Sequence, residues 1–229
     1  MRSIVVTGTD TGVGKTTVAA ALARSLRSKG INVGVMKPFA ASKERYSVKY
    51  RSEDTAILAK AAGVDDYDHE INPFFYSLPA APFVATSITK ETPITIMGAV
   101  SSLEKLKTKH DFLIIEGIGG LMVPLTEKET FADFARVLNA PMIVVASCKI
   151  GILNHILLTL HVSRNYGLRT AGLVLNSFPC RPSVIDRQLV DAVRRFCDIE
   201  SIFTIPRLRR ERQSQLELDD KILDKILAF

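Results

Sequence analysis

A glycine-rich segment near the amino terminus combines residue types that bind phosphate groups. It spans residues 8–17 with the sequence GTDTGVGKTT, between an apolar run and a helical pattern, a placement that disfavours an incidental turn. Backbone N–H groups at such a turn, with the positive end of the helix dipole, bind anions. Lys15 would reach the β- and γ-phosphates of a nucleotide, and the Thr16 hydroxyl would ligate Mg²⁺. Five residues separate Gly8 from Gly14, one more than is usual, so the sequence predicts a variant P-loop.

Two acidic residues are candidates for completing a magnesium site. Glu116 ends an apolar run and leads into a glycine-rich turn, and ligands of open α/β sheets bind at such strand ends. Bound Mg²⁺ normally requires a carboxylate of this kind. Asp54 is the second candidate, although in isolation it fits an ordinary first-turn helix carboxylate with Ser52 as the N-cap. The alternative for Glu116 is a surface glutamate at a strand exit.

A second lysine, Lys37, follows the apolar run that starts at Val33 and precedes Pro38. It would leave the sheet at the same edge as the phosphate loop. Two lysines that converge on one cleft suit a reaction whose intermediates carry additional negative charge. From spacing alone, a solvated lysine at a strand end explains Lys37 equally well.

Apolar strand-like runs alternate with helix-period segments along the chain. Runs typical of strands buried on both faces of a parallel sheet occupy 3–7, 33–37, 112–116, 142–147, 172–176 and 201–205. Helical patterns occupy 16–29, 54–62, 94–107, 131–138, 154–166, 184–196 and, at the C-terminus, 216–229. This alternation predicts a three-layer α/β fold of the P-loop NTPase kind, with a mostly parallel central sheet flanked by helices, as one domain over residues 1–229. Two segments, 38–51 and 72–82, are expected to be irregular, and either functional or mobile.

Composition and cysteine usage favour a cytoplasmic protein. The chain has 229 residues, of which 47% are hydrophobic and 24% charged. Its apolar stretches are shorter than the ~20 residues of a membrane span, and we expect no signal peptide. Cys148, Cys180 and Cys197 lack metal-ligand spacing and fit reduced thiols. The net charge of +6 comes mostly from scattered basic residues without interleaved aromatics, so we expect no nucleic-acid partner and no membrane association.

Seven short motifs occur in order along most of the chain. They are GTDT at 8–11, VGKT at 13–16, KP at 37–38, EGIGG at 116–120, PL at 124–125, FAD at 131–133 and GILNH at 151–155. Together they resemble the dethiobiotin synthetase family, whose phosphate loop has the same five-residue spacing. The resemblance covers the chain from the first predicted strand to at least Pro206.

The resemblance implies a homodimeric, ATP- and Mg²⁺-dependent ligase that closes a ureido ring on 7,8-diaminononanoate. One amine of this substrate captures CO₂ as a carbamate, and ATP phosphorylates a carbamate oxygen. The second amine attacks the resulting carbamic-phosphoric anhydride, which leaves dethiobiotin, ADP and phosphate. Carbamate and γ-phosphate are both anionic, and Lys15, Lys37, Mg²⁺ and the loop N–H groups would neutralise their repulsion.

The resemblance also assigns roles residue by residue. The implied catalytic residues are Lys37, Lys15 and Thr11. The implied magnesium ligands are Thr16, Asp54 and Glu116. The implied nucleotide contacts are Gly12, Val13, Gly14, Lys15, Thr16, Thr17, Asp54, Glu116, Gly117, Ile118, Gly119, Asn176, Ser177, Ile205, Pro206 and Arg207. The implied substrate contacts are Ser42, Pro79, Ala81, Gly151 and Asn154.

Several of these assignments leave alternatives open. The family's serine in the Lys-Pro loop matches either Ala41 or Ser42, and we favour Ser42. Asn154 would bind the substrate's distal carboxylate across the dimer interface, or cap a helix, or do both. Asn176 would read a base edge through paired donor and acceptor groups. Arg207 replaces a more apolar residue of the family, so the preference among ATP, CTP and GTP stays open at this point.

Two other functions share the phosphate loop. An amidotransferase or cobyrinate diamide synthase would need a further domain with a nucleophilic cysteine, which we do not expect after the sheet. A nucleotide-switched partitioning ATPase usually carries another lysine early in the loop, where this chain has Thr9 or Asp10, and often a membrane-binding tail. The sequence shows neither feature.

Overall fold

A six-stranded parallel sheet forms the centre of the protein, whose computed structural model describes residues 2–197, 199 and 201–228. The strand order is β2-β5-β1-β6-β7-β8, and each pairing is parallel. The strands are β1 Arg2–Gly8, β2 Val33–Met36, β5 Phe112–Glu116, β6 Met142–Ser147, β7 Thr170–Phe178 and β8 Ile202–Pro206. A separate two-stranded parallel sheet pairs β3, Phe39–Ala41, with β4, Phe74–Tyr76. The predicted α/β architecture with a mostly parallel sheet is confirmed.

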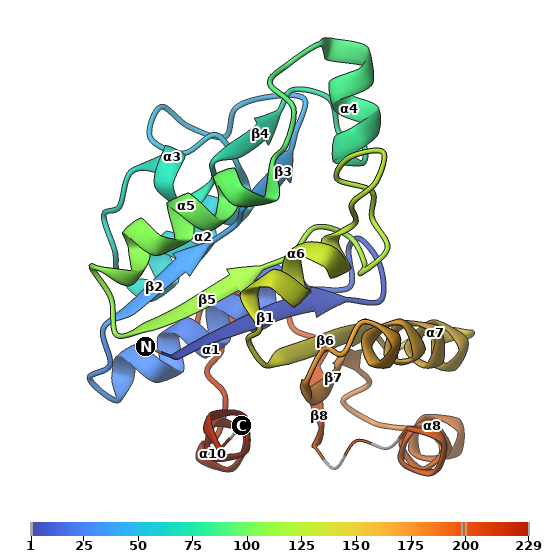
Figure 1. Ribbon diagram of the computed structural model, residues 1–229. Coiled ribbons are helices and arrows are strands. Elements are labelled where there is room, and N and C mark those ends of the chain that lie inside the picture. The colour runs from blue at the N-terminus through green and yellow to red at the C-terminus, as the bar shows by residue number, and fades with distance from the viewer. Residues whose placement is uncertain (1, 198, 200, 229) are drawn as a thin grey trace.

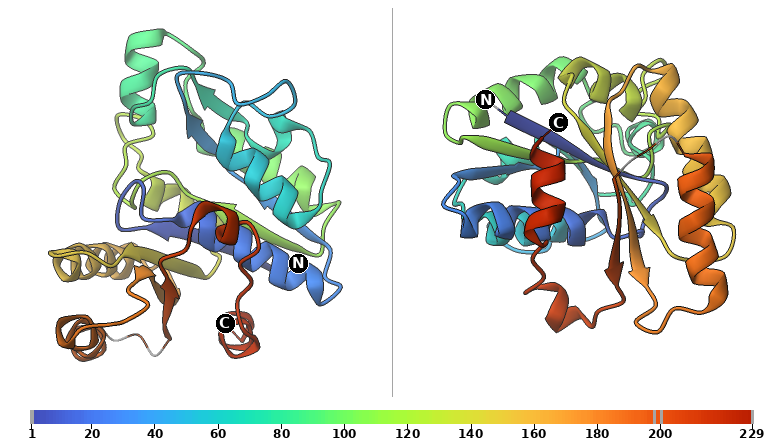
Figure 2. Two further views of the ribbon diagram at one scale, coloured as in Figure 1. Left: turned by 180° about the vertical axis from the view of Figure 1, so that it is seen from behind. Right: turned by 90° about the horizontal axis from the view of Figure 1, so that it is seen from below.

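Helices cover both faces of the central sheet and give the three layers seen in Figures 1 and 2. One layer contains α1 Lys15–Ser28, α2 Glu53–Ala62 and α10 Asp220–Leu227. The opposite layer contains α5 Ile96–Lys107, α6 Phe131–Leu138, α7 Ile152–Asn165 and α8 Val184–Phe196. The shorter helices are α3 Asp68–Ile71, α4 Pro82–Thr89 and α9 Arg210–Gln213. In the part of the chain that the structure describes, no helix combines the length and apolarity that a bilayer crossing would need.

The central strands send successive side chains into the two layers. In β1, Ile4 and Val6 join the core beneath α1, whereas Val5 joins the core on the other face. In β5, Ile114 and Ile115 divide in the same way. Because side chains alternate across a strand, burial on both faces requires an unbroken apolar run. This is the pattern from which the strands were predicted.

Most predicted elements lie within two residues of their expected bounds, and three differences matter. The segments expected to be irregular contain β3 and β4, which pair with each other across more than 30 residues. Helix α7 begins at Ile152, after Gly151 with φ +83°, so the interpretation of Asn154 as an N-cap is wrong. The C-terminal helix begins at Asp220 rather than at 216, because Asp219 caps it by accepting from the Ile222 N–H. Its predicted last residue, Phe229, lies outside the described residues.

Candidate active site

A cleft of about 580 Å³ opens at the carboxyl edge of the central sheet. The phosphate loop after β1, Lys37 after β2 and Glu116 at the end of β5 all line it. Asp54 from α2 and the segment 79–81 complete its walls. Parallel strands end at one edge, so residues far apart in sequence are brought together where α/β sheets bind their ligands.

Two glycines with left-handed backbone conformation shape the phosphate loop. Gly12 has φ +74° and Gly14 has φ +97°, a region that disfavours any residue with a Cβ. At Gly14 the space is also filled, since an added Cβ would lie 2.0 Å from Asn176 Nδ2. That nitrogen donates to the Val13 carbonyl at 2.9 Å. Helix α1 begins directly after Gly14, so the positive end of its dipole points at the loop.

Lys15 is a buried ammonium group at the wall of the cleft. Its residue is 6% exposed, and its Nζ donates to the Asp10 carbonyl at 2.8 Å. Burial, and then repulsion from Lys37, lower the pKa of Lys15 to about 8, while Glu116 and Asp54 oppose the shift in part. The charge of Lys15 therefore changes within a pH range that binding experiments can reach.

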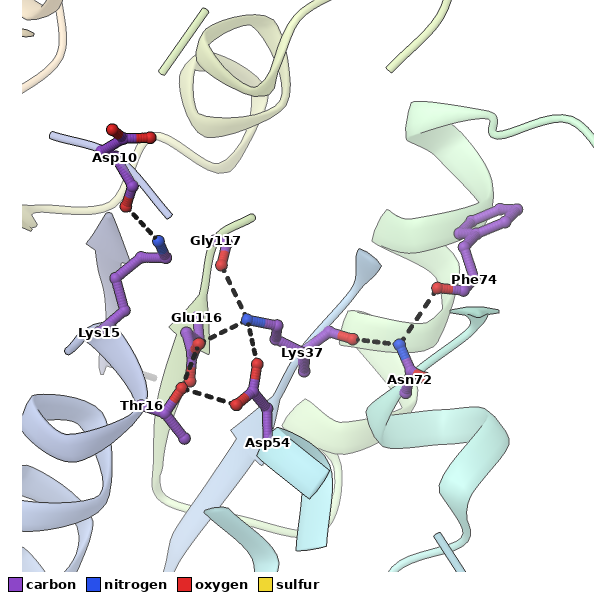
Figure 3. A network of polar contacts seen from close by, with 9 residues as sticks. All are labelled: Asp10, Lys15, Thr16, Lys37, Asp54, Asn72, Phe74, Glu116 and Gly117. Carbon is purple, nitrogen blue, oxygen red and sulfur yellow. Dashed lines mark hydrogen bonds and ion pairs between the residues drawn. The ribbon is translucent and has the colours of Figure 1, made fainter. Parts of the chain in front are cut away.

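The three predicted magnesium ligands meet at one point (Figure 3). Thr16 Oγ1 lies 2.9 Å from both Asp54 Oδ1 and Glu116 Oε1. Glu116 Oε2 is buried without a hydrogen-bond partner among the described residues. An orphaned carboxylate oxygen beside a second carboxylate and a hydroxyl matches the hard oxygen ligands that Mg²⁺ prefers. The side chains present therefore fit this ion.

A magnesium ion at this point would need oxygens beyond the protein carboxylates. Nowhere in the described ranges do three or more His, Cys, Asp or Glu side chains form a group that could hold a metal. Magnesium bound to nucleotides characteristically takes one or two carboxylates and completes its shell with phosphates and water. The pair Asp54 and Glu116 is of that kind.

Lys37 is buried, so the alternative of a solvated strand-end lysine is wrong. The residue is 4% exposed, and Glu116 beside it is 1% exposed, which also excludes a surface glutamate. Lys37 Nζ lies 2.5 Å from Glu116 Oε1, 3.0 Å from Asp54 Oδ2 and 3.1 Å from the Gly117 carbonyl oxygen (Figure 3).

The electrostatics of this cluster keep Lys37 charged. Burial alone lowers the pKa of Lys37, but the carboxylates of Glu116 and Asp54 outweigh it and raise that pKa above its ordinary value. Burial likewise raises the pKa of Asp54, and attraction to Lys37 reverses this, so the pKa is lowered overall. An ammonium held between two carboxylates thus keeps its charge.

The cleft collects most of the residues predicted for catalysis and phosphate binding. Its lining includes Thr11, Gly12, Gly14, Lys15, Thr16, Thr17, Lys37, Asp54, Glu116, Ile118 and Gly119. Val13 is buried beneath the loop, and Gly117 turns its carbonyl to Lys37. Sequence reasoning missed Ala40, Ser52 and Val123 as lining residues. Only Ser52 offered a signal, since a residue that precedes a helix can face the same edge as Asp54.

The predicted substrate contacts near the cleft need one correction. Pro79 and Ala81 line the cleft, and so does Ala41. Ser42 does not line it, because its hydroxyl donates to the Glu44 carbonyl at 2.9 Å in the turn after β3. Of the two alternatives for this loop position, the structure therefore places Ala41 at the cleft.

The predicted contacts of the nucleotide base lie at the ends of β7 and β8, outside this cleft. Asn176 commits one of its amide donors to the phosphate loop, which reduces what it can offer to a base edge. Ser177 has φ +56° at a register shift between the two strands. Ile205 is buried, whereas Pro206 and Arg207 are exposed.

The remaining predicted substrate contacts, Gly151 and Asn154, lie at the exposed start of α7 and outside the cleft. Ile150 just before the helix is 102% exposed, and Leu158 on the helix is 58% exposed. Residues 154 and 158 share one face of the helix because they are four positions apart. The start of α7 therefore exposes the amide of Asn154 together with the apolar side chains of Ile150 and Leu158.

We predict that nucleotide affinity falls as the pH rises above about 8, the pKa of Lys15. Phosphates attract the protonated ammonium, so affinity is constant well below this pH and drops by up to ~10-fold per pH unit above it. Calorimetric titration with ADP between pH 7 and pH 9.5 measures the effect. In Lys15→Met the slope should vanish, and an unchanged slope in that variant would contradict the assignment to Lys15.

Comparison with known proteins adds family relationships to this geometry. A protein-family model described as an AAA domain matches residues 2–213. The ATP-dependent dethiobiotin synthetase of Bacillus licheniformis is 34% identical over 216 residues, which cover 94% of this chain and 90% of the relative. The enzyme of the same name from Nitrosopumilus maritimus is 39% identical over 178 residues, covering 78% and 77%.

Solved structures with the same architecture are more distant in sequence. The cell-division protein MinD of Aquifex aeolicus superposes with a TM-score of 0.57 at 15% identity, covering all of this chain and 96% of its own. MinD of Pyrococcus horikoshii, solved with Mg-ADP, gives 0.52 at 18% identity, with 99% and 93% covered. At this identity the likeness concerns the fold alone.

Proposed function

The chain belongs to the ATP-dependent dethiobiotin synthetase family, and on that premise we propose that the described cleft carries out the ring closure. The protein is accordingly an ATP-dependent ligase of biotin biosynthesis. The observation that carries the proposal is the pair of buried ammonium groups, Lys15 and Lys37, which line one cleft with Thr16, Asp54 and Glu116. Such groups would offset the repulsion between a carbamate and the γ-phosphate in the cleft.

The proposed reaction proceeds in three bond changes. A nitrogen of 7,8-diaminononanoate bonds to the carbon of CO₂ and loses a proton, which gives a carbamate. A carbamate oxygen bonds to the γ-phosphorus of ATP as the bond to ADP breaks. The second nitrogen bonds to the carbamate carbon and loses a proton, while the bond from that carbon to the phosphorylated oxygen breaks and phosphate leaves with its electron pair. No side chain forms a covalent bond, so the protein acts through position and charge.

In this scheme the two lysines screen the anions that must meet. We propose that Lys15 contacts the β- and γ-phosphates and that Lys37 faces the carbamate and the transferred phosphoryl group, with Thr11 beside them in the cleft. Charge contacts that strengthen in the transition state contribute about 3–4 kcal/mol each. The structure supports this role for Lys37, because its raised pKa keeps it protonated at neutral pH.

Magnesium would be held by Thr16, Asp54 and Glu116, which already converge with one carboxylate oxygen unsatisfied. When bound, the ion supplies further screening of the phosphate charge. Lys37 touches both carboxylates at the same time. These carboxylates therefore tie the position of the lysine to that of the metal site.

The substrate would occupy the part of the cleft lined by Ala41, Pro79 and Ala81. We propose a homodimer in which Gly151 and Asn154 of the partner subunit bind the distal carboxylate of the diamine. The start of α7 exposes two large apolar side chains, Ile150 and Leu158, which supports a role as an interface. We further propose that residues 1–229 form one domain, and that the enzyme works in the cytoplasm without nucleic-acid or membrane partners.

Replacing Lys37 by alanine should lower the rate of dethiobiotin formation by a few hundred-fold, because one transition-state charge contact is lost. Product is measured by mass spectrometry with the diamine, bicarbonate and MgATP, and ADP binding should persist. Lys105→Ala, at an exposed position of α5, is the control and should keep the wild-type rate. Wild-type ATP hydrolysis that responds to DNA or lipid rather than to diamine and bicarbonate would instead indicate a nucleotide switch.

The shared site predicts complementation between two defective variants. Lys37→Ala and Asn154→Ala should each be weakly active, and mixing them under subunit exchange should restore about a quarter of wild-type activity, since half of the dimers then contain one intact site. The mass of the wild-type particle is measured in parallel by light scattering. A monomeric mass, or no gain on mixing, would rule out a site built across the interface.

Nucleotide choice tests the proposed role of Arg207. We propose that this exposed arginine contacts the base or ribose, so Arg207→Leu should change the ratio of kcat/KM among ATP, CTP and GTP by about 2- to 5-fold, the effect of an exposed charge. The neighbouring Arg209→Leu is the matched control. Equal ratios in wild type and Arg207→Leu would remove Arg207 from nucleotide recognition.

A further inference from the structure

The main chain at Lys37 is held in place by a segment from elsewhere in the sequence. From its contacts we infer that Asn72 is a positioning residue, which sets where the Lys37 ammonium lies during ring closure. The inference rests on the proposed function of Lys37. Asn72 does not line the cleft, and it belongs to none of the seven sequence motifs.

Asn72 and its neighbours fix both sides of the Lys37 peptide. The Lys37 N–H donates to the Ile71 carbonyl at 2.9 Å, and Asn72 Nδ2 donates to the Lys37 carbonyl at 2.6 Å (Figure 3). The same amide nitrogen reaches the Phe74 carbonyl at 3.2 Å. Phe74 in turn donates its N–H to the Pro38 carbonyl at 3.1 Å. Three hydrogen bonds therefore join residues 37–38 to residues 71–74, and the bond from Asn72 to Phe74 braces the second segment; we call these four bonds the clamp.

The clamp supplies backbone hydrogen bonds that residues 37–38 would otherwise lack. Lys37 lies beyond the last residue of β2, so the central sheet no longer fixes its backbone. Pro38 has no N–H and cannot donate to a neighbouring strand. Without hydrogen bonds from another segment, the backbone N–H and carbonyl of Lys37 would have no partner. Asn72 supplies that partner for the Lys37 carbonyl.

The environment of Asn72 argues against a role in stability alone. Asn72 is fully buried, yet its Oδ1 has no hydrogen-bond partner within the described ranges. A buried acceptor that is left unpaired lowers the free energy of unfolding. The asparagine offsets this cost through its Nδ2, which donates to the Lys37 and Phe74 carbonyls and so holds them in place.

The segment that contains Asn72 also contacts the chain just before Asp54, the second carboxylate beside the Lys37 ammonium. The guanidinium of Arg51 donates to the Asn72 carbonyl and to Asp68 Oδ2, both at 2.5 Å. Arg51 lies three positions before Asp54, whose carboxylate is 3.0 Å from Lys37 Nζ. The segment that fixes the Lys37 backbone thus also anchors the approach to α2, so the lysine and its counter-ion are placed by a common support.

A steady-state comparison separates positioning from stability. In Asn72→Ala we expect kcat to fall by ~10- to 100-fold, the effect of displacing a catalytic group by about 1 Å, while KM for ATP and the affinity for ADP stay within about twofold of wild type. Ser163→Ala is the matched control. Its buried hydroxyl contacts the Leu168 carbonyl and Thr170 Oγ1 in a distant part of the fold. This variant should lose stability in urea and keep its kcat.

Two further measurements make the outcome decisive. In a Lys37→Ala background, Asn72→Ala should cause no additional loss of rate, since it acts through a side chain that is already absent. Crystal structures of wild type and Asn72→Ala should show Lys37 Nζ moved away from Glu116. A folded Asn72→Ala with wild-type kcat, fully multiplicative effects in the double variant, or an unmoved Lys37 would each overturn the inference. Failure of the wild type to make dethiobiotin would count against the proposed function instead, and the crystallographic comparison would still decide the position of Lys37.

Discussion

The burial of one ammonium group between two carboxylates is the constraint on which the rest of the site depends. Taking Lys37 out of water is unfavourable unless its charge is met at short range, and Glu116 and Asp54 meet it at 2.5 and 3.0 Å. These partners come from the end of β5 and the start of α2, so the strand order of the sheet and the packing of α2 both serve one charge. Because the carboxylates also converge on Thr16, the lysine and the phosphate loop cannot be displaced independently.

The architecture alone does not distinguish this chain from other proteins with the same layers. The MinD structures show that the same layers occur in cell-division proteins, so the sheet alone does not determine what is bound. The dethiobiotin synthetases match the chain along most of its length. The family relationship thus narrows what the fold leaves open, and the proposed function assigns the chemistry to side chains at the edge of the sheet.

Much of the fold was predictable because burial on both faces of a parallel sheet leaves a strong sequence signal. The bounds of β5, β6, α6 and α8 match the prediction at both ends. The pair β3 and β4 was missed because each strand has three residues, and a strand that short gains its identity only from a partner distant in sequence. The phosphate loop was equally predictable from the sequence, because its glycines adopt φ values that few other residues tolerate.

The environment of Lys37 could not be predicted, because spacing alone does not reveal what packs on a strand end. Asn72 was invisible for the same reason, as an asparagine before a proline is ordinary in a turn. Ser42 was favoured over Ala41 as the match to the family's serine, but its hydroxyl donates to the Glu44 carbonyl in the turn after β3.

The contact between Gly14 and Asn176 restricts how this enzyme can be redesigned. A side chain in place of Gly14 would have to adopt a left-handed backbone conformation, and it would displace the side-chain amide of Asn176. The phosphate loop and the end of β7 are therefore coupled, and a change in one has to be accommodated by the other. Redesign of the loop should therefore leave both residues unchanged, whereas the exposed end of β8 carries no such constraint from the loop.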